Sequence, residues 1–194
     1  MTDPQDTGRR YRTIVADPPW PIKPTGPRTH PENGGWASGS HDGLTSAPPY
    51  ETLSVEEIAA LPVREFADRT AHLYLWTFGS FIQDAYDVAR LWGFRPSTLL
   101  TWCKVPMGLG FGGTFTPTAE HVLFARRGVL PATQRIDTTW FQWPRGTHSR
   151  KPEAFLDLVE QVSPAPRLEM FARRQRLGWD TWGNEALNHV EIAS

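Results

Sequence analysis

A carboxylate, two prolines and an aromatic ring stand consecutively at Asp17-Pro18-Pro19-Trp20. Pro18 biases Asp17 toward an extended backbone, and the two pyrrolidine rings fix φ, so the carboxylate and the neighbouring carbonyls are pre-positioned hydrogen-bond acceptors. A planar amine on a heteroaromatic ring is a poor nucleophile because its lone pair is delocalised. Two acceptors that take its N–H groups localise that lone pair on nitrogen, while an exposed Trp20 stacks on the ring. The tetrapeptide predicts a site suited to methylating the amino group of adenine.

The tetrapeptide has a second interpretation, in which a buried strand simply ends in a Pro-Pro turn with a packing tryptophan. The preceding run, 12–16, is short and β-branched, as in a buried strand. In open α/β sheets, ligands collect at the carboxyl ends of strands. The position of Asp17 therefore agrees with a site, but other segments must decide between the two interpretations.

Apolar runs and turn signals predict the elements that position this loop. Ser54 and Glu57 form a capping box for a helix that ends by Leu61. A second helix has an apolar stripe that begins at Phe81 and stops at Gly93, and a third begins at Pro152. The expected strands cover 12–16, 71–77, 98–104, 121–125 and 167–171. This alternation predicts an α/β fold with a mostly parallel sheet covered on both faces.

The length of 194 residues predicts one domain. We expect this domain to cover 11–187, with flexible termini at 1–10 and 188–194. The segments 21–50 and 106–118 are rich in proline and glycine and are expected to be mobile, functional loops.

Cysteine and hydropathy patterns limit the possible locations of the protein. The single Cys103 excludes a disulfide framework and a Cys-built zinc site, which indicates a reducing compartment. The apolar runs are too short for a membrane span, and the start has no signal-like apolar region. The six histidines show no metal-ligand spacing. We expect a soluble, cytoplasmic protein without a metal site.

The net charge of −1 conceals a basic block. Residues 126–176 contain ten Lys and Arg against five Asp and Glu, a balance that suits phosphate contact but also suits an ordinary solvated face. Arginine dominates, and the three lysines are Lys23, Lys104 and Lys151.

Several short motifs occur in a specific order over nearly the whole chain, interrupted by 21–50. They are Ala16–Trp20, Tyr50–Ser54, Leu73–Trp76, Leu91–Phe94, Glu120–His121, Ser149–Pro152, Leu168–Phe171, Gly178–Trp179 and Trp182–Glu185. In these motifs the chain resembles the N(6)-adenine methyltransferases related to the catalytic subunit of the eukaryotic messenger-RNA adenosine methyltransferase, a family with small bacterial and phage members.

The resemblance implies a Rossmann-like methyltransferase fold in permuted order, in which the catalytic loop precedes the main cofactor segments. It implies S-adenosylmethionine as cofactor. By position, Asp17 and the Pro18 carbonyl engage the target amino group, Pro19 completes the catalytic turn, and Trp20 stacks on the base. The cofactor-binding residues implied by position are Asp17, Ser149, Lys151, Phe171, Arg173, Asn184 and Glu185.

Three details of the cofactor segments need separate comment. Lys151 is expected to pair with the carboxylate of the cofactor, since a cation is otherwise disfavoured at a helix start. Arg150 and Arg176 stand where the eukaryotic enzyme has His and Asn, which leaves contacts at these positions open. Glu169 is flanked by apolar residues and needs a partner, either structural or in the site.

The resemblance leaves the substrate open. Base stacking and phosphate contact are expected from Lys23, Arg28, Trp36, Phe115 and Arg145. Arg126, Arg127 and Arg150 would join Arg145 in a modest nucleic-acid groove. DNA is favoured over RNA as the substrate, and a free adenine nucleotide or nucleoside is the alternative. A near-neutral charge without a recognition domain also suggests a homodimer or a partner subunit. A catalytically inactive scaffold is the rival from another class, although the intact tetrapeptide argues against it.

Overall fold

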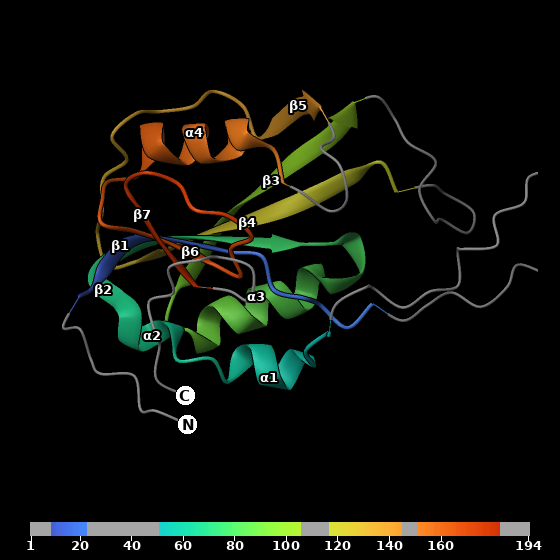
Figure 1. Cartoon of the computed structure of the whole chain (residues 1–194), viewed down its shortest axis with the longest axis horizontal. Coiled ribbons are helices and arrows are strands. Elements are labelled where there is room, and N and C mark those ends of the chain that lie inside the picture. The colour runs from blue at the N-terminus through green and yellow to red at the C-terminus, as the bar shows by residue number, and fades with distance from the viewer. Residues whose placement is uncertain (1–8, 23–50, 106–116, 145–150, 183–194) are drawn as a thin grey trace, which may run out of the picture.

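The computed structural model describes residues 9–22, 51–105, 117–144 and 151–182. They form one seven-stranded sheet in the order β5-β3-β4-β2-β1-β6-β7 (Figure 1). The strands are β1 (Tyr11–Ala16), β2 (Ala67–Thr77), β3 (Arg95–Val105), β4 (Ala119–Arg127), β5 (Trp140–Pro144), β6 (Arg167–Met170) and β7 (Trp179–Trp182).

Six of these strands run in one direction. β4 is antiparallel to both of its neighbours, β2 and β3, and every other pairing is parallel. The first strand of the chain, β1, therefore lies inside the sheet between β2 and β6. The expected α/β architecture with a mostly parallel sheet is confirmed.

Helices cover both faces of the sheet. α4 (Glu153–Val162) lies on one face, and α1 (Val55–Ala59), α2 (Val63–Phe66) and α3 (Ile82–Leu91), which follows the short 3₁₀ turn η1 (Gly79–Phe81), lie on the other (Figure 1). The predicted capping box is present, since the Glu57 amide donates to Ser54 Oγ over 3.1 Å and the Ser54 amide donates to Glu57 Oε2 over 2.7 Å. Gly93, at φ +83°, follows the end of α3 as predicted.

Alternating side chains of β1 divide the core into two layers. Ile14 and Ala16 pack in the layer beneath α1, α2 and α3. Val15, between them, packs in the layer beneath α4 with Trp76 and Phe155. Because Asp17 follows the same alternation as Val15, the carboxylate emerges on the α4 side at the end of β1.

The structure extends the predicted elements. β2 and β3 are longer than expected, and α2, β5 and β7 were not predicted. β5 and β7 are the two edge strands of the sheet, and each is only four or five residues long. Strands this short contain too few residues for a clear alternating pattern, and they pair with segments distant in the chain.

No helix among the described residues is long and apolar enough to cross a lipid bilayer. The expected flexible termini and mobile loops fall almost entirely outside the described residues and stay predictions.

Candidate active site

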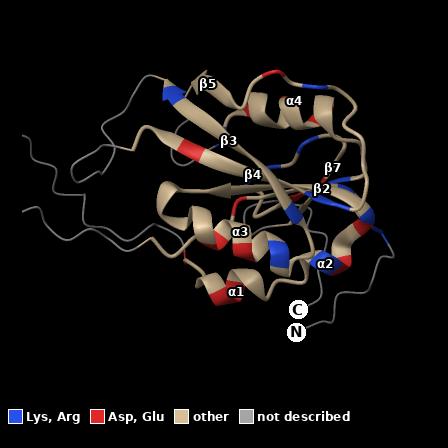
Figure 2. Cartoon of the chain, turned by 180° about the vertical axis from the view of Figure 1, so that it is seen from behind, with Lys and Arg blue, Asp and Glu red and all other residues tan. Residues whose placement is uncertain are grey.

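Charged side chains from four separate segments meet at one edge of the sheet. Asp17 follows the carboxyl end of β1, and Lys104 lies near the carboxyl end of β3. Glu120 lies near the amino end of β4, which reaches the same edge because β4 is antiparallel. Figure 2 shows the basic tip of β3 beside the acidic position of β4 at one end of the molecule. Lys151, just before α4, completes the group.

These four residues form a chain of alternating charge. Lys151 Nζ lies 3.0 Å from Asp17 Oδ1 and 3.0 Å from Glu120 Oε2. The other oxygen of Glu120 lies 2.5 Å from Lys104 Nζ. Lys151 Nζ is also 5.0 Å from the centre of the Trp76 ring, close enough for a cation–π contact. The order Lys104, Glu120, Lys151, Asp17 places Asp17 at one end, where its side chain keeps 27% of its surface exposed.

Burial and ion pairing act in opposite directions on this chain. Burial is the largest influence on Asp17 and raises its pKa above the ordinary value, against the attraction of Lys151. Burial also disfavours the charged forms of Lys151 and Glu120, but for these two residues the attraction of their ionic partners has the larger effect on the pKa. The pKa of Lys151 is raised and that of Glu120 is lowered. Lys151 and Glu120 are thus held charged, and Asp17 is the member whose charge depends most on its surroundings.

The prolines hold the loop after β1 in a compact turn. The Pro18 carbonyl accepts a hydrogen bond from the Trp20 amide at 2.9 Å, and the Pro19 carbonyl accepts one from the Leu53 amide at 3.0 Å. Because a carbonyl oxygen has a second lone pair, the Pro18 carbonyl can still accept a hydrogen bond from a target amine. That role stays a prediction. The turn places Asp17 relative to the sheet without a regular element.

The prediction that Trp20 is exposed is wrong. Its side chain is 1% exposed and stacks on Phe81, with the ring centres 5.4 Å apart. The indole Nε1 donates to the Trp76 carbonyl over 2.8 Å. Because the turn directs the ring back into the core, Trp20 fixes the loop and presents no face to a base in this structure.

A cavity lies next to Asp17 on the α4 side of the sheet. Its lining includes three predicted cofactor residues besides Asp17, namely Lys151, Phe171 and Arg173, together with Glu169. Phe171 has φ +61°, in the left-handed region that residues other than glycine seldom occupy. Its ring packs edge-on against Trp182. Strained backbone of this kind is frequent at ligand sites.

Glu169 is the buried carboxyl of this cavity. Among the described residues, its Oε2 has no hydrogen-bond partner. Burial, with the negative charge of Asp17, raises the pKa of Glu169 to about 7. An orphaned buried acceptor beside a cavity is an expected feature of a ligand site, so the structure favours site membership for Glu169 over a structural ion pair.

The remaining predicted residues divide into two groups. The first group lies outside the described residues and stays a set of predictions, namely Lys23, Arg28, Trp36, Phe115, Arg145, Ser149, Arg150, Asn184 and Glu185. Arg126 and Arg127 lie at the end of β4 opposite Glu120, and Arg127 donates to the Arg64 carbonyl. Because Arg145 and Arg150 lie outside the described residues, the predicted groove stays a prediction, with Arg126 and Arg127 at the far end of β4 from Glu120.

Sequence reasoning did not assign a site role to Glu120 or Lys104. Glu120 belongs to a family motif, and the signal for its role is a carboxylate at the start of an apolar strand, which needs a partner when buried. Lys104 is one of only three lysines in the chain. Fifteen residues lie between the two in the chain, and the pairing of β3 with β4 brings them together.

Among the residues that the structure describes, no group of His, Cys, Asp and Glu could hold a metal ion. The fold and the site define an α/β protein with an acidic catalytic loop and an adjoining ligand cavity at the carboxyl edge of its sheet.

Comparison with known proteins assigns the family. The MT-A70 family model matches residues 11–185. The chain therefore belongs to the MT-A70 family, and the predicted resemblance is confirmed. It follows that the chain is a methyltransferase, and the family to which it belongs is one of adenine N6-methyltransferases.

Two kinds of relative match the chain. The type II methyltransferase M.MunI from a Mycoplasma species is 31% identical over 198 residues, which cover 97% of this chain and 84% of that protein. A probable N(6)-adenosine-methyltransferase MT-A70-like protein from Oryza sativa subsp. japonica is 27% identical over 192 residues. An N(6)-adenosine-methyltransferase MT-A70-like protein from Arabidopsis thaliana is 26% identical over 191 residues. The match covers 94% of this chain but only 24% of each plant protein.

Proposed function

We propose that this protein methylates the exocyclic amino group of adenine in DNA, with S-adenosylmethionine as the methyl donor. The observation that carries the proposal is the placement of Asp17, whose carboxylate ends a buried chain of alternating charges and borders a cavity. A carboxylate fixed in this way is a hydrogen-bond acceptor that does not need to reorganise when the target arrives.

The residues lining the cavity fit this methyl donor. S-Adenosylmethionine carries an ammonium, a carboxylate and a sulfonium, and the cavity offers the unpartnered Oε2 of Glu169 for a donor group. Arg173 and Lys151 supply positive charge beside it, and Phe171 supplies an apolar wall. The neutral or ionised state of Glu169 near pH 7 lets it either donate or accept.

The protein contributes placement and electrostatics to the reaction. Lys151 contacts Oδ1 of Asp17, and we assign Oδ2 to an N–H of the target amine. Accepting that hydrogen bond raises electron density on the amine nitrogen. When bound, S-adenosylmethionine would supply an electrophilic methyl group, and the amine nitrogen that receives it would lose one proton. Glu120 and Lys104 keep Lys151 charged and in position.

The extent of the match favours DNA as the polymer. The type II methyltransferase relative, whose class name denotes enzymes of DNA modification, aligns over most of both chains. The plant N(6)-adenosine-methyltransferases carry about three-quarters of their length outside the match. An adenine in a duplex must be flipped out of the stack before it can reach Asp17.

Methyl transfer from labelled S-adenosylmethionine tests the proposal directly. We expect label in N6-methyladenine when the protein is incubated with adenine-containing DNA, as resolved by nucleoside mass spectrometry. Single-stranded and double-stranded DNA, the RNA of the same sequence, and adenosine monophosphate form the substrate panel. Faster transfer to RNA or to the nucleotide would overturn the choice of DNA, and label on another base would overturn the choice of adenine.

Asp17→Asn provides the matched catalytic control in the same assay. The substitution keeps the size of the side chain and removes its charge. We expect unchanged binding of DNA and a loss of transfer. Asp137→Asn, at an exposed ion pair with Arg135, should retain full activity.

A further inference from the structure

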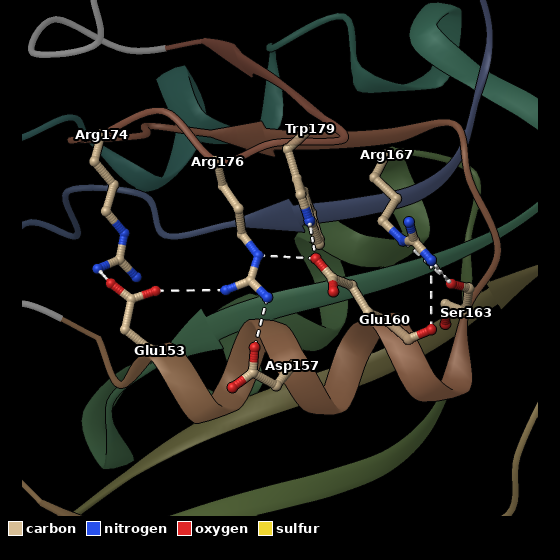
Figure 3. Close-up of polar contacts among 8 residues, drawn as sticks. All are labelled: Glu153, Asp157, Glu160, Ser163, Arg167, Arg174, Arg176 and Trp179. Atoms are coloured by element: carbon tan, nitrogen blue, oxygen red, sulfur yellow. Dashed lines mark hydrogen bonds and ion pairs between the residues drawn. The ribbon is translucent and has the colours of Figure 1, made fainter.

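The segment 171–178 connects β6 to β7 and forms one wall of the cavity beside Asp17. Phe171 and Arg173 of this segment line the cavity, and Arg174 and Arg176 follow them in the chain. Figure 3 shows that Arg174 and Arg176 reach across to α4. The segment therefore contacts α4 in addition to being joined to β6 and β7.

Arg176 makes the most extensive contacts with α4. Its Nε lies 2.8 Å from Glu160 Oε1, its Nη2 lies 2.5 Å from Asp157 Oδ1, and its Nη1 lies 3.5 Å from Glu153 Oε2. The three carboxylates occupy positions i, i+4 and i+7 of one helix, so they line one face of it. The planar guanidinium presents its donors in a fixed fork, which this row of acceptors matches.

Neighbouring side chains strengthen the same contact. Arg174 pairs with Glu153, and the indole Nε1 of Trp179 donates to Glu160 Oε1 over 2.7 Å (Figure 3). Arg176 keeps only 21% of its side-chain surface exposed, whereas the carboxylate of Asp157 keeps 57%. We call the set of Glu153, Asp157, Glu160, Arg174 and Arg176 the α4 clamp.

The α4 clamp fixes the positions of two walls of the cavity relative to each other. The residues just before α4 include Lys151, which reaches Asp17 from one side. Arg176, docked along the same helix, holds the segment that brings Phe171 and Arg173 to the other side. A shift of this segment along α4 would change the width of the cavity without touching Asp17 or Lys151.

We propose that Arg176 is a positioning residue for binding of the methyl donor, because its contacts with three carboxylates of α4 hold Phe171 and Arg173 at the cavity. The inference rests on the proposed function. It also gives a role to a position where sequence reasoning left the contacts open, since the guanidinium of Arg176 faces α4. A residue that acts in this way alters affinity for the donor and leaves the chemical step unchanged.

Calorimetric titration with S-adenosylmethionine and steady-state kinetics on the same samples test the proposal. We expect Arg176→Ala to raise the Kd and the KM for the donor roughly tenfold, with kcat at saturating donor within a factor of two of the parent. Arg176→Lys keeps the charge but loses the fork, so it should raise the Kd only about threefold. Asp157→Asn should also raise the Kd for the donor.

Arg135→Ala is the matched control, since Arg135 also pairs with a carboxylate but is exposed and lies outside the cavity lining. It should leave the Kd unchanged. A lowered melting temperature with an unchanged Kd in Arg176→Ala would overturn the proposal and leave a purely structural role. If Arg176→Ala does not fold, an unchanged Kd in both Arg176→Lys and Asp157→Asn overturns it. Absence of donor binding by the parent protein would instead overturn the proposed function.

Discussion

Two networks of charged residues lie beside α4, one that includes Lys151 just before the helix and one along its length, and their carboxylates differ in burial. The chain Lys104, Glu120, Lys151 and Asp17 lies at the catalytic edge, where the four side chains keep between 11% and 27% of their surface exposed. In the α4 clamp the carboxylates are more exposed, with 59% for Glu153, 57% for Asp157 and 33% for Glu160, whereas Arg174 and Arg176 keep 19% and 21%. The contacts of Arg176, at 2.5–3.5 Å, are close in length to those of the buried chain, at 2.5–3.0 Å, so distance alone does not separate them.

Burial determines what each network can do. Removing charges from water costs several kcal/mol per ion, and a buried pair seldom stabilises a protein more than apolar residues would. Exposed pairs cost little and contribute about 0.2–1 kcal/mol each. The buried chain is therefore best explained by its chemical role at Asp17, and the α4 clamp by its ability to align two segments at low cost.

The largest effect is expected from Lys151→Met. The substitution removes the cation between two buried carboxylates, and breaking a buried pair costs about 3–5 kcal/mol. We expect the free energy of unfolding, from urea denaturation, to fall by that amount. Lys104→Met, at the end of the chain, leaves Glu120 paired and should cost less. Equal losses for the two variants would contradict the arrangement of Lys151 between Asp17 and Glu120.

Asp17→Asn should affect catalysis more than stability. A preorganised hydrogen-bonding group at a reacting centre contributes roughly 10²–10³ in kcat, so we expect a loss of that size in single-turnover methyl transfer. The melting temperature should change little, because Glu120 still pairs with Lys151. A tenfold loss or less would remove Asp17 from the catalytic role.

Glu169→Gln should change the pH dependence of stability. The folded-state pKa of about 7 lies above the ordinary value of 4.5, so protonated Glu169 stabilises the native state at low pH and this contribution is lost as pH rises toward 7. Between pH 4.5 and 8, we expect the free energy of unfolding of the parent to fall by about 3 kcal/mol relative to that of the variant. A constant difference across this range, measured by denaturation, would show that Glu169 is not perturbed.

The smallest effect is expected in the α4 clamp. Asp157→Asn should lower the free energy of unfolding by less than about 1 kcal/mol. High salt should abolish this difference, since exposed charges are screened. The loss from Lys151→Met should persist in 1 M NaCl. If the loss of unfolding free energy in Asp157→Asn did not change with salt, the α4 clamp would not be an exposed, screened network, and the difference from the buried chain would be contradicted.

Much of the fold could be predicted where the sequence pattern is local. The capping box at Ser54 and the glycine stop at Gly93 are read directly from neighbouring residues, and the structure confirms both. The position of Asp17 at a strand end followed from the apolar run before it. The edge strands β5 and β7 could not be predicted because their pairing depends on distant segments.

The site was less predictable because its contacts are long-range. Lys151 was identified, but its two carboxylate partners come from β4 and from the loop after β1. The position after a strand end predicts an exposed Trp20, yet its ring stacks on Phe81, which lies about sixty residues further along the chain. Local sequence gives the residue types of such a site, whereas the sheet order gives their partners.

The burial of Trp20 changes how the Asp-Pro-Pro-Trp signature should be understood. Its first residue faces the cavity, and its last belongs to the hydrophobic core, tied to the Trp76 carbonyl and to Phe81. The four residues of the signature thus form one structural unit with Trp76 and Phe81, which are distant in the sequence. Grafting them onto a strand end of another protein would transfer the carboxylate without its anchor, so a search for such enzymes by design or by motif should require the matching pocket for the indole as well.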